Sequence, residues 1–305
     1  QIVKAADFDS VLTLVRQKRT ELNSVNVATA LHRVAIHTKR NRADRDRMLR
    51  DPRFISLLDS VQECAPECNP RSVSDVMWAF ATMQHWPPTM LKPMLTQVAV
   101  HLKSSAFEPQ HLSLIIWAFA ILQCKPVKLL EQIEMQAMSN IDRFNMQNCA
   151  NLLWGFAKLN YQADALLPGL TARVTSPGVL SESKPVEVSD LAFAVAVLGS
   201  AEKDAPLLDA IATRGSSAGI LPSFTSRQVV TMLWAFARLR ATPPGAILSE
   251  WVSVVRASHE AKPLLAADQR NCRRALEALG QETEWLDPPK VEEEEGAAVA
   301  AAAEA

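Results

Sequence analysis

The amino-acid sequence predicts an all-α fold, an α-solenoid of about seven helix-turn-helix repeats, each about 38–40 residues long. The first observation is a short block, Leu-Leu-Trp-Gly-Phe-Ala-Lys-Leu at residues 152–159, which recurs with small changes on both sides. The tryptophans of its four clear copies lie at positions 78, 117, 154 and 234, at intervals of 39, 37 and 80 residues. The second observation is that 48% of the residues are hydrophobic and the mean hydropathy is near zero, as in chains that bury a large core.

Weaker copies of the block extend the repeat in both directions. A decayed copy at 191–198, with Phe193 in the tryptophan position, divides the long interval in two. Fainter copies lie at 30–35 and 274–279. Seven copies at this spacing account for almost the whole chain.

The predicted domain organisation follows from this register. The solenoid covers residues 1–280, with degenerate caps at about 1–68 and 254–280, because the outer faces of terminal repeats meet water. Residues 281–305 contain eight acids and one lysine and end in a run of alanines, which predicts a low-complexity tail.

The start of the first helix in each repeat is predicted by two positions before the tryptophan. Eight residues before it, proline recurs (Pro70, Pro109 and Pro185), and proline is tolerated at the first helical position because its missing N–H would be unpaired there. A second helix follows a turn that often contains proline, as at Lys125-Pro126. Mostly good N-cap residues stand nine residues before the tryptophan, at Asn23, Asn69, Glu108, Asn145, Lys184 and Thr225.

The aromatic positions of the block are predicted to form the core of the repeats. They follow a wide apolar stripe at helical spacing along the first helix of each repeat. The predicted core residues are Trp78, Phe80, Trp117, Phe119, Trp154, Phe156, Phe193, Trp234 and Phe236.

Two polar columns lie beside this stripe, six and three residues before the tryptophan. At about 100° per residue these columns share one helix face with the small residue that follows the tryptophan, which is alanine or glycine in five repeats. Short polar side chains that vary from repeat to repeat, with room beside them for a base, suit an array that binds single-stranded RNA. The alternative is that the polar residues are solvated helix starts and that the alanines serve close helix packing.

The segment from Phe107 to Ala120 resembles the repeat core of the octotricopeptide repeat family, and residues 144–159 and 224–239 resemble it too. The repeats of this chain are also similar to the heptatricopeptide repeats found beside RAP domains. The resemblance implies sequence-specific RNA binding in an organelle. By that analogy, and by helix geometry, the candidate base-contact residues are Asn26, Thr29, Ser72, Asp75, His111, Asn148, Asn151, Gln228, Thr231 and Asn271.

A basic segment lies near the N-terminus. Residues 33–53 hold eight basic and three acidic side chains, and residues 1–280 together carry 31 basic and 25 acidic side chains. Phosphate contacts, which give affinity without sequence information, are expected from this segment and from the N-termini of the first helices. The alternative is a solvated helix face or a contact with an acidic protein. The phosphate-contact candidates are Arg40, Arg42, Arg45, Arg47 and Arg50.

Other classes of protein find little support. The five cysteines have no paired spacing, so neither a disulfide framework nor a metal site is expected. We find no Gly-rich phosphate loop and no nucleophile motif, which argues against an enzyme, a cofactor or a small-molecule substrate. No run of 18 apolar residues occurs, which argues against a membrane span.

The resulting hypothesis is an RNA-binding helical-repeat protein with no catalytic role, in complex with RNA and other proteins. We expect a structural subunit that binds a single-stranded or structured RNA segment, such as rRNA, in a ribonucleoprotein such as a mitochondrial ribosome. The alternatives are a protein–protein scaffold and a factor for the maturation, stability or translation of one organellar transcript. The expected location is the mitochondrion, with the chloroplast as alternative, and because the chain begins at Gln1 we expect any targeting segment to lie outside it.

Overall fold

The computed structural model describes residues 1–199 and 203–287, and every regular element within them is helical. The predicted all-α class is therefore confirmed. The α-helices are α1 (Phe8–Gln17), α2 (Ser24–Thr38), α3 (Arg42–Leu49), α4 (Pro52–Cys64), α5 (Pro70–Met83), α6 (Pro88–Lys103), α7 (Pro109–Ile121), α8 (Val127–Ser139), α9 (Met146–Lys158), α10 (Leu166–Thr175), α11 (Pro185–Leu198), α12 (Ala205–Gly215), α13 (Ser226–Leu239), α14 (Gly245–Ala261) and α15 (Ala266–Ala278).

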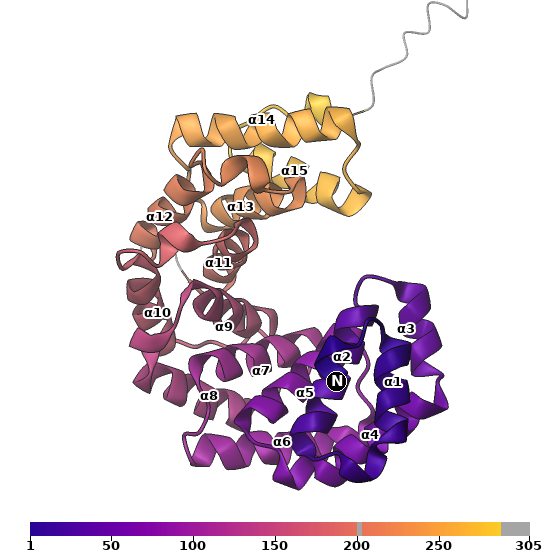
Figure 1. Cartoon of the computed structure of the whole chain (residues 1–305). Helices are drawn as coiled ribbons and strands as arrows, with labels where there is room; N and C mark the ends of the chain where they lie inside the picture. The colour runs from indigo at the N-terminus through magenta and orange to yellow at the C-terminus, as the bar shows by residue number, and fades with distance from the viewer. Residues whose placement is uncertain (200–202, 288–305) are drawn as a thin grey trace, which may run out of the picture.

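The helices form two concentric rows in a C-shaped solenoid (Figure 1). The inner row is α2, α5, α7, α9, α11, α13 and α15, each packed on the next, and it lines the concave side. The outer row is α4, α6, α8, α10, α12 and α14. At the N-terminal end, α1 packs on α2 and α4. The short α3 lies between α2 and α4 in the sequence and contacts both of them. Seven inner helices correspond to the seven predicted repeats.

Each inner helix except the last begins at its predicted N-cap. The cap residues Asn23, Asn69, Glu108, Asn145, Lys184 and Thr225 all hold that position in the structure. The side-chain oxygen of Asn145, for example, accepts a bond of 2.9 Å from the N–H of Asn148. Because a cap satisfies N–H groups that have no partner inside the helix, these residues fix the helix starts.

Five of the seven inner helices also end in a repeated way, at the sixth position after the tryptophan position. Gln84, Gln123, Asn160 and Arg240 all have a positive φ there, between 46° and 55°, and the last repeat has Gly280 with a φ of 70°. The next N–H then reaches back to the carbonyl of the phenylalanine position, as in the 2.9 Å bond from Cys124 to Phe119. This left-handed cap turns the chain toward the outer helix.

A second repeated bond closes each hairpin. In four successive repeats, a side chain near the end of the outer helix donates to the backbone carbonyl ten residues before the tryptophan position. The donor and acceptor pairs are His101 and Cys68, Gln136 and Phe107, Arg173 and Phe144, and Arg214 and Ser183, at 2.8 to 2.9 Å. These bonds satisfy buried carbonyls that precede each helix start.

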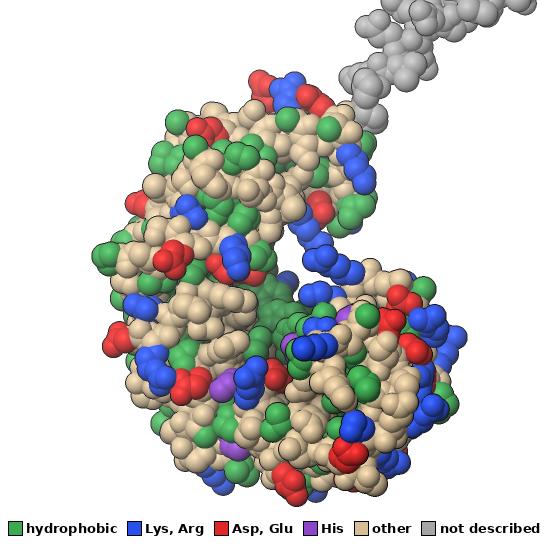
Figure 2. Space-filling view, in the orientation of Figure 1, with side chains coloured by type: hydrophobic (Ala, Val, Ile, Leu, Met, Phe, Trp, Pro, Cys, Tyr) green, Lys and Arg blue, Asp and Glu red, His purple; other side chains and the backbone are tan. Residues whose placement is uncertain are grey.

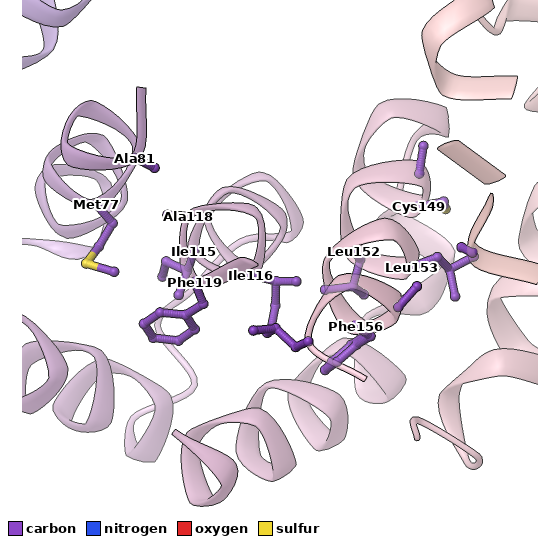
Figure 3. Packing of buried hydrophobic residues seen from close by; sticks show 14 of the residues in the cluster. Met77, Ala81, Ile115, Ile116, Ala118, Phe119, Cys149, Leu152, Leu153 and Phe156 are labelled. Atoms are coloured by element: carbon purple, nitrogen blue, oxygen red, sulfur yellow. The ribbon is translucent and has the colours of Figure 1, made fainter. Parts of the chain in front are cut away.

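The core lies between the two rows and between neighbouring inner helices (Figure 3). The phenylalanines at 80, 119, 156 and 236 are at most 2% exposed, as predicted. The tryptophan position was also predicted to be core, but its side chains are less buried than core residues. Trp78, Trp117, Phe193 and Trp234 are only half-buried and pack against the core, and Trp154 is half-buried as well.

The small residue after the tryptophan is buried in the contact between inner helices. A Cβ atom on Gly155 would lie 2.0 Å from Cγ2 of Ile116 and 3.2 Å from its backbone carbon. Ala79, Ala118, Ala194 and Ala235 at the same position are fully buried. These residues therefore serve close helix packing, which was the alternative to their role in a surface strip.

The C-terminal end of the array extends beyond residue 280. Leu286, in the 3-10 helix η7 (Glu284–Leu286), is fully buried, and η7 packs on α14. Arg273 and Asp287 form an ion pair of 2.6 Å. Residues 281–287 of the predicted tail thus belong to the folded array, and residues 288–305 lie outside the described residues.

Candidate RNA-binding face

The face that the inner helices turn to the concave side is formed by four columns of each repeat. They are the positions seven and three before the tryptophan, the tryptophan position itself, and the position four after it, which together span roughly 60° of a helix at about 100° per residue. Almost all of these side chains are half-buried or exposed. We call these columns the concave strip.

The tryptophan position gives the concave strip a row of aromatic side chains. In chain order the row is His32, Trp78, Trp117, Trp154, Phe193 and Trp234. At its ends the rings of successive repeats lie against one another: the ring centres of His32 and Trp78 are 4.6 Å apart, and Phe193 stacks on Trp234 at 5.7 Å and 20°. A row of half-exposed aromatic rings along a hollow offers flat apolar surface to planar ligands.

Cationic side chains lie between the rings. The Nζ atom of Lys158 is 4.4 Å from the ring centre of Phe193 and 5.5 Å from that of Trp154. The guanidinium of Arg238 lies 5.6 Å from the ring centre of Trp234. Both residues occupy the position four after the tryptophan, so each cation sits over its own aromatic ring.

The concave strip is hollowed at its two ends. At the N-terminal end a groove of about 770 Å³ runs over α2, α5 and α7, where Thr29, His32, Asp75, Trp78 and His111 line it. At the C-terminal end two smaller hollows of about 360 and 390 Å³ share Trp234 and Asn271. Figure 2 shows hydrophobic side chains on the floor of the concave side and Lys and Arg side chains at its mouth.

The column three before the tryptophan lies on the concave strip, as predicted for base-contact residues. Thr29 and Asp75 line the N-terminal groove, while Thr231 and Asn271 line the C-terminal hollow with Phe193 and Trp234. Asn151, in the middle repeat, is half-buried. Thr29, Asp75, Asn151 and Thr231 each neighbour the aromatic ring one turn further along the helix, whereas Asn271 is followed there by Arg274.

The column six before the tryptophan lies at the starts of the inner helices, where most of its side chains bond to the backbone of the N-cap residue. His111, Asn148, Glu187 and Gln228 each accept a bond from the backbone N–H of their own N-cap residue, at 2.8 to 3.4 Å. Such reciprocal bonds form a capping box, which stabilises the helix start.

Burial further limits this column. Ser72 and Asn148 are 3% and 7% exposed, so they present little surface to a base, and the predicted contact at these two positions is not supported. His111 and Asn26 are half-buried and line hollows at the N-terminal end, so their predicted base contact stays a prediction. Gln228 is half-buried as well, and it stays a prediction with them.

The five arginines predicted to contact phosphate lie on or next to α3, which packs against α2 and α4 at the N-terminal end. Arg42 pairs with Asp46 at 3.8 Å, Arg47 pairs with Asp44 at 3.3 Å, and the Arg47 guanidinium also lies 4.9 Å from the ring centre of Phe8. Arg40, Arg45 and Arg50 complete the set. The predicted arginines thus form a surface of the N-terminal cap, and the concave strip has its own cations.

The aromatic row and its cations were not predicted, because large aromatic residues at helical spacing are ordinarily core residues. One signal was present in the sequence. Lysine or arginine stands one turn after the aromatic residue in two repeats, at Lys158 and Arg238, where a buried stripe would not tolerate a charge.

Two aspartates of the concave strip, Asp190 and Asp75, have pKa values above the ordinary value of an aspartate. Burial is the main cause that raises the pKa of Asp190 to about 7; nearby Glu187 adds to the rise and Lys158 opposes it. Burial also raises the pKa of Asp75, against the charge of Arg71 and that of His32 in its protonated form. Burial lowers the pKa values of His32 and His111, which favours the neutral form of both imidazoles.

The described residues contain neither a metal-ion cluster nor a membrane-spanning helix. Within residues 1–199 and 203–287, we find no cluster of three His, Cys, Asp or Glu side chains that could hold a metal ion. Over the same residues, no helix is both long and apolar enough to span a lipid bilayer.

Comparison with known proteins gives two matches. Residues 55–267 match the family described as RNA-editing substrate-binding complex 6 protein. Over 235 residues the chain is 26% identical to a protein of Oryza sativa subsp. japonica, the RAP domain-containing protein, chloroplastic. That stretch is 73% of this chain and 30% of the Oryza protein, so the chain spans less than a third of that relative. The resemblance to repeats of RAP-domain proteins is thereby supported, whereas the octotricopeptide repeat family stays a prediction.

Proposed function

The chain belongs to the family of RNA-editing substrate-binding complex 6 proteins, and from this membership we propose that it binds single-stranded RNA along the concave strip. The family name refers to a complex that binds RNA substrates, and the Oryza relative is named as chloroplastic. The proposed setting is therefore an organellar complex of RNA and protein.

The aromatic row interleaved with cations is the observation that carries this proposal. Proteins that bind single strands combine basic side chains, which follow the phosphates, with aromatic rings on which bases stack. Lys158 and Arg238 lie directly over rings of the row, and Arg71 and Arg227 are exposed at its edge. Duplex RNA hides its base faces, so the row favours unpaired RNA.

The nature of the complex is the finer part of the proposal. A subunit that holds RNA for other proteins fits the family name, with no catalytic role for this chain. The mitochondrial ribosome, the mitochondrion as location with the chloroplast as alternative, and a transcript-specific factor remain predictions from the sequence. The alternative function is a protein–protein scaffold, which would bind a protein partner on the same concave side and no RNA.

Two experiments together test the proposal. Purified protein should bind unpaired RNA more tightly than a duplex of the same sequence, and log affinity should fall linearly with log salt. Crosslinking to RNA in the native organelle, followed by sequencing, should give discrete sites. Sites on ribosomal RNA would support the ribosomal subunit, and sites on messengers or precursors the transcript factor. Equal binding of duplex and single strand, or no enrichment over background, would refute the proposal.

A further inference from the structure

The N-terminal groove of the concave strip places a carboxylate beside an aromatic ring. Asp75 and Trp78 are three residues apart on α5, so their side chains are neighbours on one helix face. Both line the groove of about 770 Å³, together with Arg71 and His111. The side chain of Asp75 is 25% exposed, which leaves its oxygen atoms accessible from the groove.

The groups around Asp75 are hydrogen-bond donors. Arg71 lies with Nε 3.8 Å from a carboxylate oxygen of Asp75, and with 82% of its side chain exposed it can move toward a ligand. The Nδ1 atom of His111 accepts a bond from the backbone N–H of Glu108, so the neutral ring carries its proton on Nε2. The groove therefore presents one acidic acceptor, two donors and the ring of Trp78, against which the ring of His32 packs with 4.6 Å between ring centres.

We propose that this groove binds one unpaired guanine of the RNA, with the base against Trp78 and its Watson–Crick edge at Asp75. Guanine is the RNA base with two adjacent donors, N1–H and the N2 amino group, and both match the oxygens of a carboxylate. Its O6 atom, next to them, is an acceptor for Arg71 or His111. Uracil offers one N–H between two acceptors, and adenine and cytosine offer one amino group beside a ring acceptor.

Burial contributes to the selectivity of the groove. Asp75 is held in a partly buried site where its charged form is disfavoured, and two bonds from guanine would compensate for the lost hydration. A base that offers a ring acceptor to the carboxylate would instead place two acceptors against each other. The groove thus discriminates by repulsion as well as by attraction.

This inference rests on the proposed binding of RNA along the concave strip, and the test separates the two. The probes are labelled oligouridines with one central guanosine, inosine, adenosine or cytidine, since a single guanosine in a uniform tract can slide into register with the groove. Inosine lacks only the N2 amino group. We expect the guanosine oligomer to bind about 10-fold more tightly than the inosine oligomer and the plain oligouridine.

The protein variants complete the test. Asp75→Asn should abolish the preference for guanosine over inosine, and Asp59→Asn, which changes an exposed carboxylate on the outer helix α4, should leave that preference unchanged. Free GMP should compete only weakly, and strong competition by GMP would overturn the assignment to RNA. Equal affinities for guanosine and inosine oligomers would overturn the guanine site while leaving RNA binding intact. No binding to any oligomer would overturn both.

Discussion

The ammonium group of Lys158, on α9, lies over the ring of Phe193, on α11, with 4.4 Å between Nζ and the ring centre. One cation thereby connects the aromatic residues of two successive repeats, since the ring of Trp154 is 5.5 Å away. The positive charge and the aromatic faces that single-stranded RNA requires are therefore in one place, in the middle of the concave strip.

Replacing this cation should weaken RNA binding for all sequences alike. Lys158→Gln removes one phosphate contact, so the slope of log affinity against log salt should decrease by about 0.7 for a single strand. Fluorescence anisotropy with oligouridine over a salt series measures both the slope and the affinity. Lys128→Gln, an exposed lysine on the outer helix α8, is the control and should change neither. An unchanged slope for Lys158→Gln would place the phosphates elsewhere.

The contact between inner helices predicts an unusual cost for a glycine replacement. Gly155→Ala should gain about 1 kcal/mol of helix propensity, yet its Cβ atom collides with Ile116 at a cost near the upper end of about 1–3 kcal/mol, so the variant should lose about 1–2 kcal/mol of unfolding free energy overall. Chemical denaturation measures the difference. Gly245→Ala, at the start of α14 and with open space around it, should be neutral or slightly stabilising. A Gly155→Ala protein as stable as the wild type would contradict the close packing.

The left-handed caps predict a stabilising replacement. Gln123 has a φ of 53°, a conformation that costs an ordinary L-residue energy and that glycine adopts freely. Gln123→Gly should therefore raise the unfolding free energy by about 0.5–1 kcal/mol, as the natural Gly280 suggests for the last repeat. Gln123→Ala lacks this freedom and should not stabilise. Thermal melts of both variants decide the point.

The acidity of Asp190 predicts a dependence of stability on pH. Its pKa is about 7 in the folded protein and 3.8 is its ordinary value, so between these pH values the folded state holds a proton that the unfolded state has lost. The contribution of this group to stability therefore falls as pH rises from about 4 to 7 and stays low above that. Glu187 and Lys158 are the charged groups that face it.

Asp190→Asn removes this dependence. The variant should match the wild type near pH 4 and exceed its unfolding free energy at pH 8 by on the order of 1–2 kcal/mol, allowing for partial access of water. Denaturant unfolding at several pH values measures the difference between the two proteins, with Asp164→Asn as an exposed control. A difference that does not grow with pH would mean that Asp190 is charged in the fold at neutral pH.

The sequence predicted where the helices lie better than which way they face. N-caps, prolines and the spacing of the block located six of the seven inner helices, because caps and turns are local chemistry. The predicted polar face was rotated by roughly 50° from the concave strip. A half-buried tryptophan and a buried one look alike in a sequence, and an alanine at a helix contact looks like an alanine on a surface, since both differ only in tertiary packing.

The measurement that tests the account most directly is the affinity of Trp117→Leu and Trp154→Leu for single-stranded RNA. Leucine keeps an apolar side chain at each position and removes the ring face, while Trp86→Leu, in the turn after α5, removes an indole from outside the concave strip. Base stacking contributes about 1–3 kcal/mol per ring, so each concave variant should bind roughly 10-fold or more weakly with its fold intact by circular dichroism, and the control should bind as the wild type does. Unchanged affinity in both concave variants would show that the aromatic row is not where RNA binds.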